Sequence, residues 1–135
     1  MKKLLGLLSM VFVLTTLNVA CQGKVENKEK PKDDINMTVE ELASAMKSDT
    51  SLVIVDVRTP PELVGEHGQI KGVINIPVQV IEQRVGELEK YKNKNIAVIC
   101  RSGNRSRFGT KVLLQNGYKA KNVLGGMKAY NKIKK

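Results

Sequence analysis

The sequence predicts an α/β fold in which helices cover both faces of a parallel sheet. Short apolar runs rich in Val and Ile indicate buried strands, which lie at residues 52–57, 73–76, 96–99 and 122–124. Stretches with apolar side chains at helical spacing lie before, between and after these runs. Because strands and helices alternate along the chain, we expect the strands to be parallel members of one sheet.

Length and charge narrow the class of protein. The chain has 135 residues, and about the first 35 differ in character from the rest. This leaves roughly 100 residues for one domain with one modest core. The formal net charge of +10 favours binding to nucleic acid, to an anionic membrane surface or to a small anionic substrate. The few aromatic residues do not interleave with a basic stripe, so we expect no nucleic-acid partner.

Residues 1–20 have the pattern of a secretory signal peptide. Two lysines precede an apolar run that is too short to span a membrane, and small residues then lead to Cys21. The Ala20-Cys21 pair resembles the cleavage site of bacterial lipoproteins, in which the cysteine is lipidated and becomes the new amino terminus. Asn18 stands where that pattern usually has Leu, so ordinary signal cleavage stays open. The resemblance implies an exported protein, anchored to a membrane by its lipid and facing the periplasm or the cell exterior.

The next segment, residues 21–36, is expected to be a disordered tether. Lys, Glu, Asp and Asn dominate it, and it has no apolar periodicity. The domain is then expected to span residues 37–135. Its first element is a predicted helix over residues 37–47, in which Thr38 and Glu41 have the spacing of a capping box.

Two further amphipathic helices are predicted within the domain. The first covers residues 79–91. The second, over residues 106–116, has its apolar positions at Phe108, Val112 and Leu113. A pair of glycines after the last strand precedes a final helix.

The candidate catalytic residue is Cys100, which directly follows the predicted strand 96–99. A thiol is nucleophilic as its thiolate, and the pKa of a thiol falls near helix amino termini and near arginines. Arginines follow closely, and the small residues between them let backbone amides turn inward as an anion cradle. We expect Cys100 to be ionised at neutral pH, with Arg105 facing both the sulfur and a bound anion. The residues expected to bind that anion are Arg101, Ser102, Gly103, Asn104, Arg105 and Ser106.

The loop from Cys100 to Ser106 reads Cys-Arg-Ser-Gly-Asn-Arg-Ser and resembles the active-site loop of the rhodanese family of sulfurtransferases. Three other segments match the family in order: Asp-Val-Arg with a following Pro-Glu at 56–62, the stretch 68–77, and the closing pair of glycines. The resemblance implies a parallel sheet of about five strands. It also implies a cysteine that accepts a sulfane sulfur as a persulfide and passes it to a thiophile.

The expected reaction is therefore attack of the Cys100 thiolate on the outer sulfur of thiosulfate or a persulfide, after which a thiol or cyanide takes the sulfur. No cofactor is implied beyond the covalent persulfide. Asp56 and Arg58 should be tied by hydrogen bonds, because an unpaired charge in a buried strand is costly. Asp56 is interpreted as structural support, since a carboxylate close to a thiolate opposes its formation. We expect no metal site, because His67 and the two cysteines are far apart in sequence.

Two alternatives stay open. A cysteine phosphatase or arsenate reductase would use a similar loop, but phosphatases place Arg six positions after the cysteine, where this chain has Ser106. A sulfur carrier or sensing module would hold a sulfur species without turnover, and the sequence does not distinguish it from an enzyme.

Overall fold

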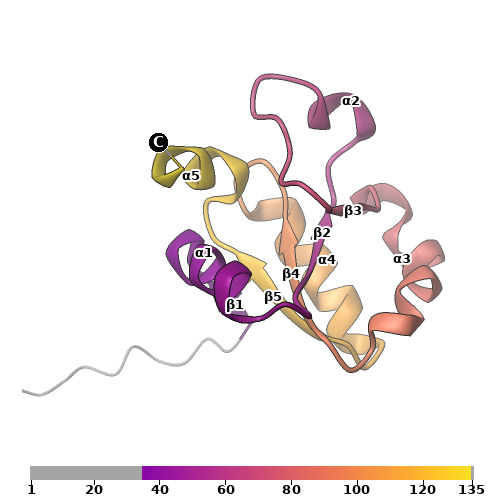
Figure 1. Cartoon of the computed structure of the whole chain (residues 1–135). Coiled ribbons are helices and arrows are strands. Elements are labelled where there is room, and N and C mark those ends of the chain that lie inside the picture. The colour runs from indigo at the N-terminus through magenta and orange to yellow at the C-terminus, as the bar shows by residue number, and fades with distance from the viewer. Residues whose placement is uncertain (1–34, 135) are drawn as a thin grey trace, which may run out of the picture.

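The computed structural model describes residues 35–134 and shows a five-stranded parallel sheet in the order β1-β5-β4-β2-β3 (Figure 1). The strands are β1 (Asn36–Met37), β2 (Val53–Asp56), β3 (Ile74–Asn75), β4 (Asn95–Ile99) and β5 (Lys119–Val123). All neighbouring strands pair in parallel. The predicted α/β class with a parallel sheet of about five strands is confirmed. The predicted signal peptide, Cys21 and the tether up to residue 34 lie outside the described residues.

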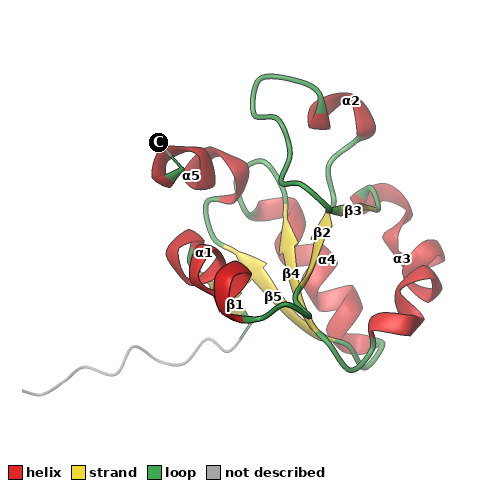
Figure 2. Ribbon diagram, viewed as in Figure 1, coloured by secondary structure: helices red, strands yellow, loops and turns green. Residues whose placement is uncertain are grey.

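Helices form the two outer layers (Figure 2). They are α1 (Val39–Ser48), α2 (Pro60–Leu63), α3 (Ile81–Arg84), α4 (Asn104–Gln115) and α5 (Gly126–Ile133), with the 3-10 helices η1 (Val78–Val80) and η2 (Val85–Tyr91) flanking α3. α1 and α5 cover one face of the sheet, α3 and α4 cover the other, and α2 lies beyond the carboxyl ends of β2 and β4. Within residues 35–134, no helix is long and apolar enough to cross a bilayer.

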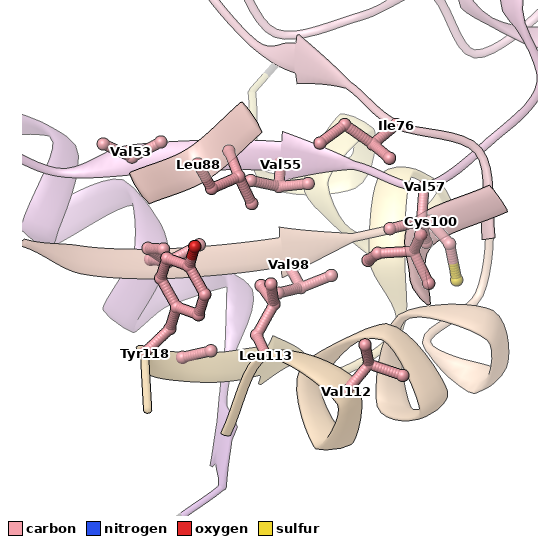
Figure 3. Packing of buried hydrophobic residues seen from close by; sticks show 13 residues of the cluster. Val53, Val55, Val57, Ile76, Leu88, Val98, Cys100, Val112, Leu113 and Tyr118 are labelled. Atoms are coloured by element: carbon pink, nitrogen blue, oxygen red, sulfur yellow. The ribbon is translucent and has the colours of Figure 1, made fainter. Parts of the chain in front are cut away.

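The strand side chains alternate between two apolar clusters, because successive residues of a strand point to opposite faces. Val55, Val98 and Cys100 share the cluster between the sheet and α4 (Figure 3). The cluster on the opposite face contains Ile54, Ala97 and Ile99 with residues of α1 and α5. Cys100 therefore points to the same face of the sheet as Val98, and its side chain lies against α4, the helix that follows the loop.

The first helix has the predicted capping box at Thr38, but it begins at Val39 rather than 37 because Met37 belongs to β1. The amide of Glu41 donates to Thr38 Oγ1 at 3.1 Å, and the amide of Thr38 donates to Glu41 Oε2 at 2.7 Å. This is the reciprocal capping box that the sequence indicated.

Two short elements were not predicted. Asn36, assigned to the tether, belongs to β1 and pairs with Asn122 of β5, so the ordered domain begins earlier than expected. A two-residue strand is too short for any periodicity, and its pairing depends on β5, far along the chain. The second is α2, which begins with Pro60 and Pro61, since Pro at the first helical position loses no hydrogen bond.

Other boundaries differ from the predictions. The predicted helix over 79–91 is broken into η1, α3 and η2, and Gly86 inside it lowers the helical propensity. β5 begins at Lys119 rather than 122, because exposed lysines alternate there with buried residues. α4 begins at Asn104 rather than near Ser106. Phe108 was predicted to face the core, but its side chain is 48% exposed.

Candidate active site

Cys100 lies at the carboxyl end of β4, and the structure buries it completely. It is a free thiol. Val57 lies beside Cys100 and Val98 lies before it along the strand, in the apolar layer between the sheet and α4 (Figure 3). The sulfur is therefore at the end of this apolar layer. Cys100 has no exposed surface in this structure.

The loop after Cys100 turns back toward the sulfur at Gly103. This glycine has φ 98°, a conformation that other residues rarely adopt, and it caps the amino end of α4. Its amide donates to Cys100 Sγ at 3.1 Å. Arg101, Ser102 and Asn104 are exposed around it. The Gly103 amide therefore faces the sulfur, while the side chains of Arg101, Ser102 and Asn104 face solvent.

Ser106 provides a second donor to the sulfur. It is fully buried in the first turn of α4, and its Oγ lies 3.3 Å from Cys100 Sγ. The same Oγ lies 2.7 Å from Oδ1 of Asn122, a fully buried residue of β5. Asn122 Nδ2 in turn donates to Asn36 Oδ1 at 2.8 Å. Asn122 was not predicted as a site residue, although a polar residue at the start of the last predicted strand was a signal for it.

These contacts act on the pKa of Cys100 in opposite directions. Burial raises the pKa, because a thiolate loses hydration. Hydrogen bonds from the Ser106 hydroxyl and from the backbone amides of Ser106, Ser102 and Gly103 outweigh burial, and they hold the pKa of Cys100 below its ordinary value. The loop and the start of α4 therefore favour the thiolate mainly through hydrogen bonds rather than through neighbouring arginines.

Arg105 is half-buried and forms an ion pair with Glu62 of α2. Its Nη1 and Nη2 donate to the two carboxylate oxygens at 2.8 and 2.7 Å. This planar fork was predicted to grip a bound anion, and in the structure one hydrogen of each terminal nitrogen is donated to Glu62. The sequence did contain a signal for Glu62, which follows Thr59 at capping-box spacing and accepts from the Thr59 amide at 3.1 Å. The other loop arginines, Arg101 and Arg107, are exposed.

Asp56 and Arg58 form a buried pair beside this loop. Arg58 Nε lies 3.0 Å from both carboxylate oxygens of Asp56, and Nη2 donates to Oδ2 at 2.6 Å. The guanidinium also donates to the carbonyls of Glu62 and Gly68, at 3.1 and 2.8 Å. The pair therefore fixes α2 and the segment after it against the end of β2.

The amino end of α5 supports the loop from the other side. The amides of Met127 and Lys128 donate to the carbonyls of Cys100 and Arg101 at 2.8 and 3.1 Å. A Cβ at Gly126 would overlap the Cys100 carbonyl oxygen, so a larger residue at this position would displace the loop. This close approach explains why glycine occupies position 126, the first residue of α5.

Within residues 35–134, no three His, Cys, Asp or Glu side chains converge in a way that could hold a metal ion. His67 lies on the turn after α2, where its carbonyl accepts from Asn131 of α5 at 3.0 Å. The structure shows no bond that links it to Cys100.

The sheet order, the glycine-containing loop after β4 and the buried cysteine can be compared with known proteins. The sequence model of the rhodanese-like domain family matches residues 38–133. The chain belongs to this family. The matched range begins at the N-cap of α1 and ends with α5, so the rhodanese-like domain includes every element around Cys100 except β1.

Relatives of this rhodanese-like domain include sulfur-handling proteins. It is 33% identical over 108 residues to the putative sulfur carrier protein YrkF of Bacillus subtilis, and the match covers 79% of this chain but only 56% of that protein. It is 33% identical over 74 residues to the thiosulfate sulfurtransferase PspE of Escherichia coli, covering 55% of this chain and 69% of the relative. A solved rhodanese-like domain protein of Staphylococcus aureus is similar with a TM-score of 0.63 at 33% identity, covering 70% of this chain and 89% of that one.

The ion pair between Glu62 and Arg105 should make the stability of this domain depend on pH in the acid range. Arg105 holds the pKa of Glu62 at about 2, below the ordinary 4.5. A depressed carboxylate pKa stabilises the fold above the unfolded value, and this contribution is lost as the pH falls from about 4.5 toward 2. We expect Glu62→Gln to lower the thermal midpoint at pH 7, with the difference from wild type vanishing across that window. The exposed neighbour Glu66 provides the control, and a pH-dependent difference of equal size in Glu66→Gln would contradict this assignment.

Proposed function

We propose that the protein is a sulfurtransferase that carries a sulfane sulfur as a persulfide on Cys100. The observation that carries this proposal is the geometry at Sγ, where the Gly103 amide and the Ser106 hydroxyl both approach the sulfur at the amino end of α4. Donors aimed at a buried sulfur stabilise a thiolate, the nucleophilic form of cysteine. The family and the names of the relatives support sulfur transfer as the class of reaction.

The proposed reaction has two displacement steps. The Cys100 thiolate attacks the outer sulfur of thiosulfate or of a persulfide, forming a new S–S bond while the donor's S–S bond breaks and sulfite or a thiolate leaves. A thiolate or cyanide then attacks the outer sulfur of the Cys100 persulfide, and the Cys100 thiolate is released. The loop amides stabilise the negative charge at each stage. No cofactor takes part.

Anion binding in this scheme uses the exposed part of the loop. Arg101, Ser102 and Asn104 lie at the surface beside the sulfur, and Arg105 would reach a dianionic donor only by sharing its guanidinium with Glu62. We therefore assign the first contact with thiosulfate to Arg101 and the loop amides rather than to Arg105.

A sulfur carrier without turnover is the second candidate, and the similarity to the putative sulfur carrier protein YrkF favours it. The two are separated by steady-state kinetics with thiosulfate as donor and cyanide or a small thiol as acceptor. An enzyme with a persulfide intermediate gives multiple turnovers and a ping-pong pattern. A single burst of product equal to the protein concentration would instead identify a carrier.

The residues of the loop do not favour a phosphatase. Position six after the cysteine is Ser106, whose hydroxyl contacts the sulfur, whereas a phosphatase needs a guanidinium there to hold the equatorial oxygens. We expect no hydrolysis of an aryl phosphate by the purified protein.

We also propose that the protein is exported and anchored through lipid on Cys21, with residues 21–34 as the spacer to the domain. Ala20-Cys21 in the sequence supports this proposal. Cys21→Ser should move the protein from the membrane pellet to the soluble fraction and remove a lipid mass from the mature chain. If the Ser variant pellets like wild type and wild type shows no lipid mass, the anchor is disproved and ordinary signal cleavage is the remaining explanation.

A further inference from the structure

The Ser106 hydroxyl has one proton but two acceptors within reach. Its Oγ lies 2.7 Å from Asn122 Oδ1 and 3.3 Å from Cys100 Sγ. A serine hydroxyl donates one hydrogen bond and accepts others, so it cannot donate to both groups at once. The state of the site therefore depends on which acceptor receives this proton.

The two possibilities correspond to two protonation states of the cysteine. When Ser106 donates to Asn122 Oδ1, its oxygen is free to accept the S–H of the neutral thiol. When Cys100 is ionised, the sulfur needs donors, and Ser106 can serve it only by leaving Asn122 Oδ1. The lost contact is restored if the Asn122 amide turns over and presents Nδ2 to the serine oxygen. Because Asn122 Nδ2 then no longer donates to Asn36 Oδ1, the Asn36 amide has to turn over as well and donate its own Nδ2 to Asn122 Oδ1. Amide nitrogen and oxygen occupy nearly equivalent positions, so this exchange needs almost no displacement of heavy atoms.

We propose that Asn122 is a positioning residue whose side-chain amide directs the single Ser106 proton either toward Cys100 Sγ or away from it, and thereby sets the nucleophilicity of the cysteine. Asn36 of β1 extends this chain of contacts, because it accepts from Asn122 Nδ2 at 2.8 Å. Ser106 and Asn122 are both fully buried, so water does not compete for these two side chains, whereas Asn36 is partly exposed. The inference rests on the proposed thiolate chemistry of Cys100.

Charged groups near the sulfur lie on other elements and are unchanged by substitutions at Asn122. They are Arg105 of α4 with its partner Glu62 of α2, and the Asp56–Arg58 pair at the end of β2. A change in thiol reactivity on altering Asn122 therefore reports on the Ser106 contact, once the charge of the new side chain itself is subtracted.

The test measures the alkylation rate of Cys100 by iodoacetamide against pH. Asn122→Asp offers acceptors only, so it should hold the Ser106 proton away from the sulfur. We expect the midpoint of the profile to rise by about one pH unit, which is roughly a tenfold slower alkylation below the midpoint. Asn122→Leu removes the competing acceptor and should leave the midpoint at or below the wild-type value. Asn93→Asp, an exposed site before β4, is the control for an added charge far from the sulfur.

A double substitution isolates the hydroxyl. In a Ser106→Ala background, Asn122→Asp should shift the midpoint by much less, since only the direct effect of its charge is left. An equal shift in both backgrounds would overturn the proposal, as would a rise in Asn122→Leu as large as that in Asn122→Asp. The Leu variant decides the question by itself if the buried carboxylate prevents folding. Alkylation does not require sulfur transfer, so these results stand apart from the proposed function: a wild-type protein that shows this pattern but takes up no sulfur would refute the transferase alone.

Discussion

Cys100→Ser should abolish sulfur transfer while the domain stays folded. The hydroxyl is close in size to the thiol, so the buried row that Cys100 shares with Val98 should repack with little change. A serine hydroxyl has a far higher pKa than a thiol and forms no persulfide, so the first displacement step is lost entirely. Thiocyanate formation from thiosulfate and cyanide should fall to the uncatalysed rate, a loss of several orders of magnitude.

The thermal unfolding curve of the same variant is the control for this result. Residual activity far above background would show that another group carries the sulfur. Loss of the unfolding transition together with activity would instead indicate that Cys100 is a structural core residue. Ser44→Ala on the exposed face of α1 provides the control, because it removes one hydroxyl far from the sulfur and from the loop.

Asp56→Ala should produce the largest loss of stability. It leaves the Arg58 guanidinium, which is 1% exposed, without its charged partner. Removing one member of a buried ion pair typically costs about 3–5 kcal/mol, because the remaining charge is desolvated and uncompensated. We expect a loss of this size in the free energy of unfolding by urea. Activity should fall with it, since Arg58 also holds the segment that carries Glu62.

An exposed ion pair of the same type is the control for this prediction. Arg84 and Glu87 pair at 2.6 Å on the surface, where solvent screens their attraction. Glu87→Ala should therefore leave the unfolding curve nearly unchanged. Similar losses in Asp56→Ala and Glu87→Ala would contradict the claim that burial makes the first pair essential.

The parts of the fold that the sequence predicted depend on local signals. The Thr38–Glu41 capping box and the apolar run before Cys100 are each written within a few adjacent residues, and both elements are where they were expected. β1 and β5 were missed or shortened because their pairing is decided between distant segments. Lys119 shows the difficulty, since a lysine at the start of a strand gives no apolar signal although it pairs with Asn95.

The site divides in the same way. Cys100 and the amides that surround it lie within one loop, so the predicted cradle needed no tertiary information. Glu62 is 43 residues away in sequence from Arg105, which it pairs with. Asn122 is 16 residues away from Ser106, whose hydroxyl it accepts from. Only the packing of α2 and β5 brings these side chains to the loop. The loop sequence by itself does not indicate that Arg105 pairs with Glu62, because another element supplies this carboxylate.

Intact-mass measurement after exposure to thiosulfate tests the central claim most directly. Wild-type protein should gain the mass of one sulfur atom, lose it on treatment with a thiol reductant, and release it to cyanide. Cys100→Ser should show no gain under the same conditions. An unchanged wild-type mass, or an equal gain in the Ser variant, would contradict the account of Cys100 as the residue that carries the transferred sulfur.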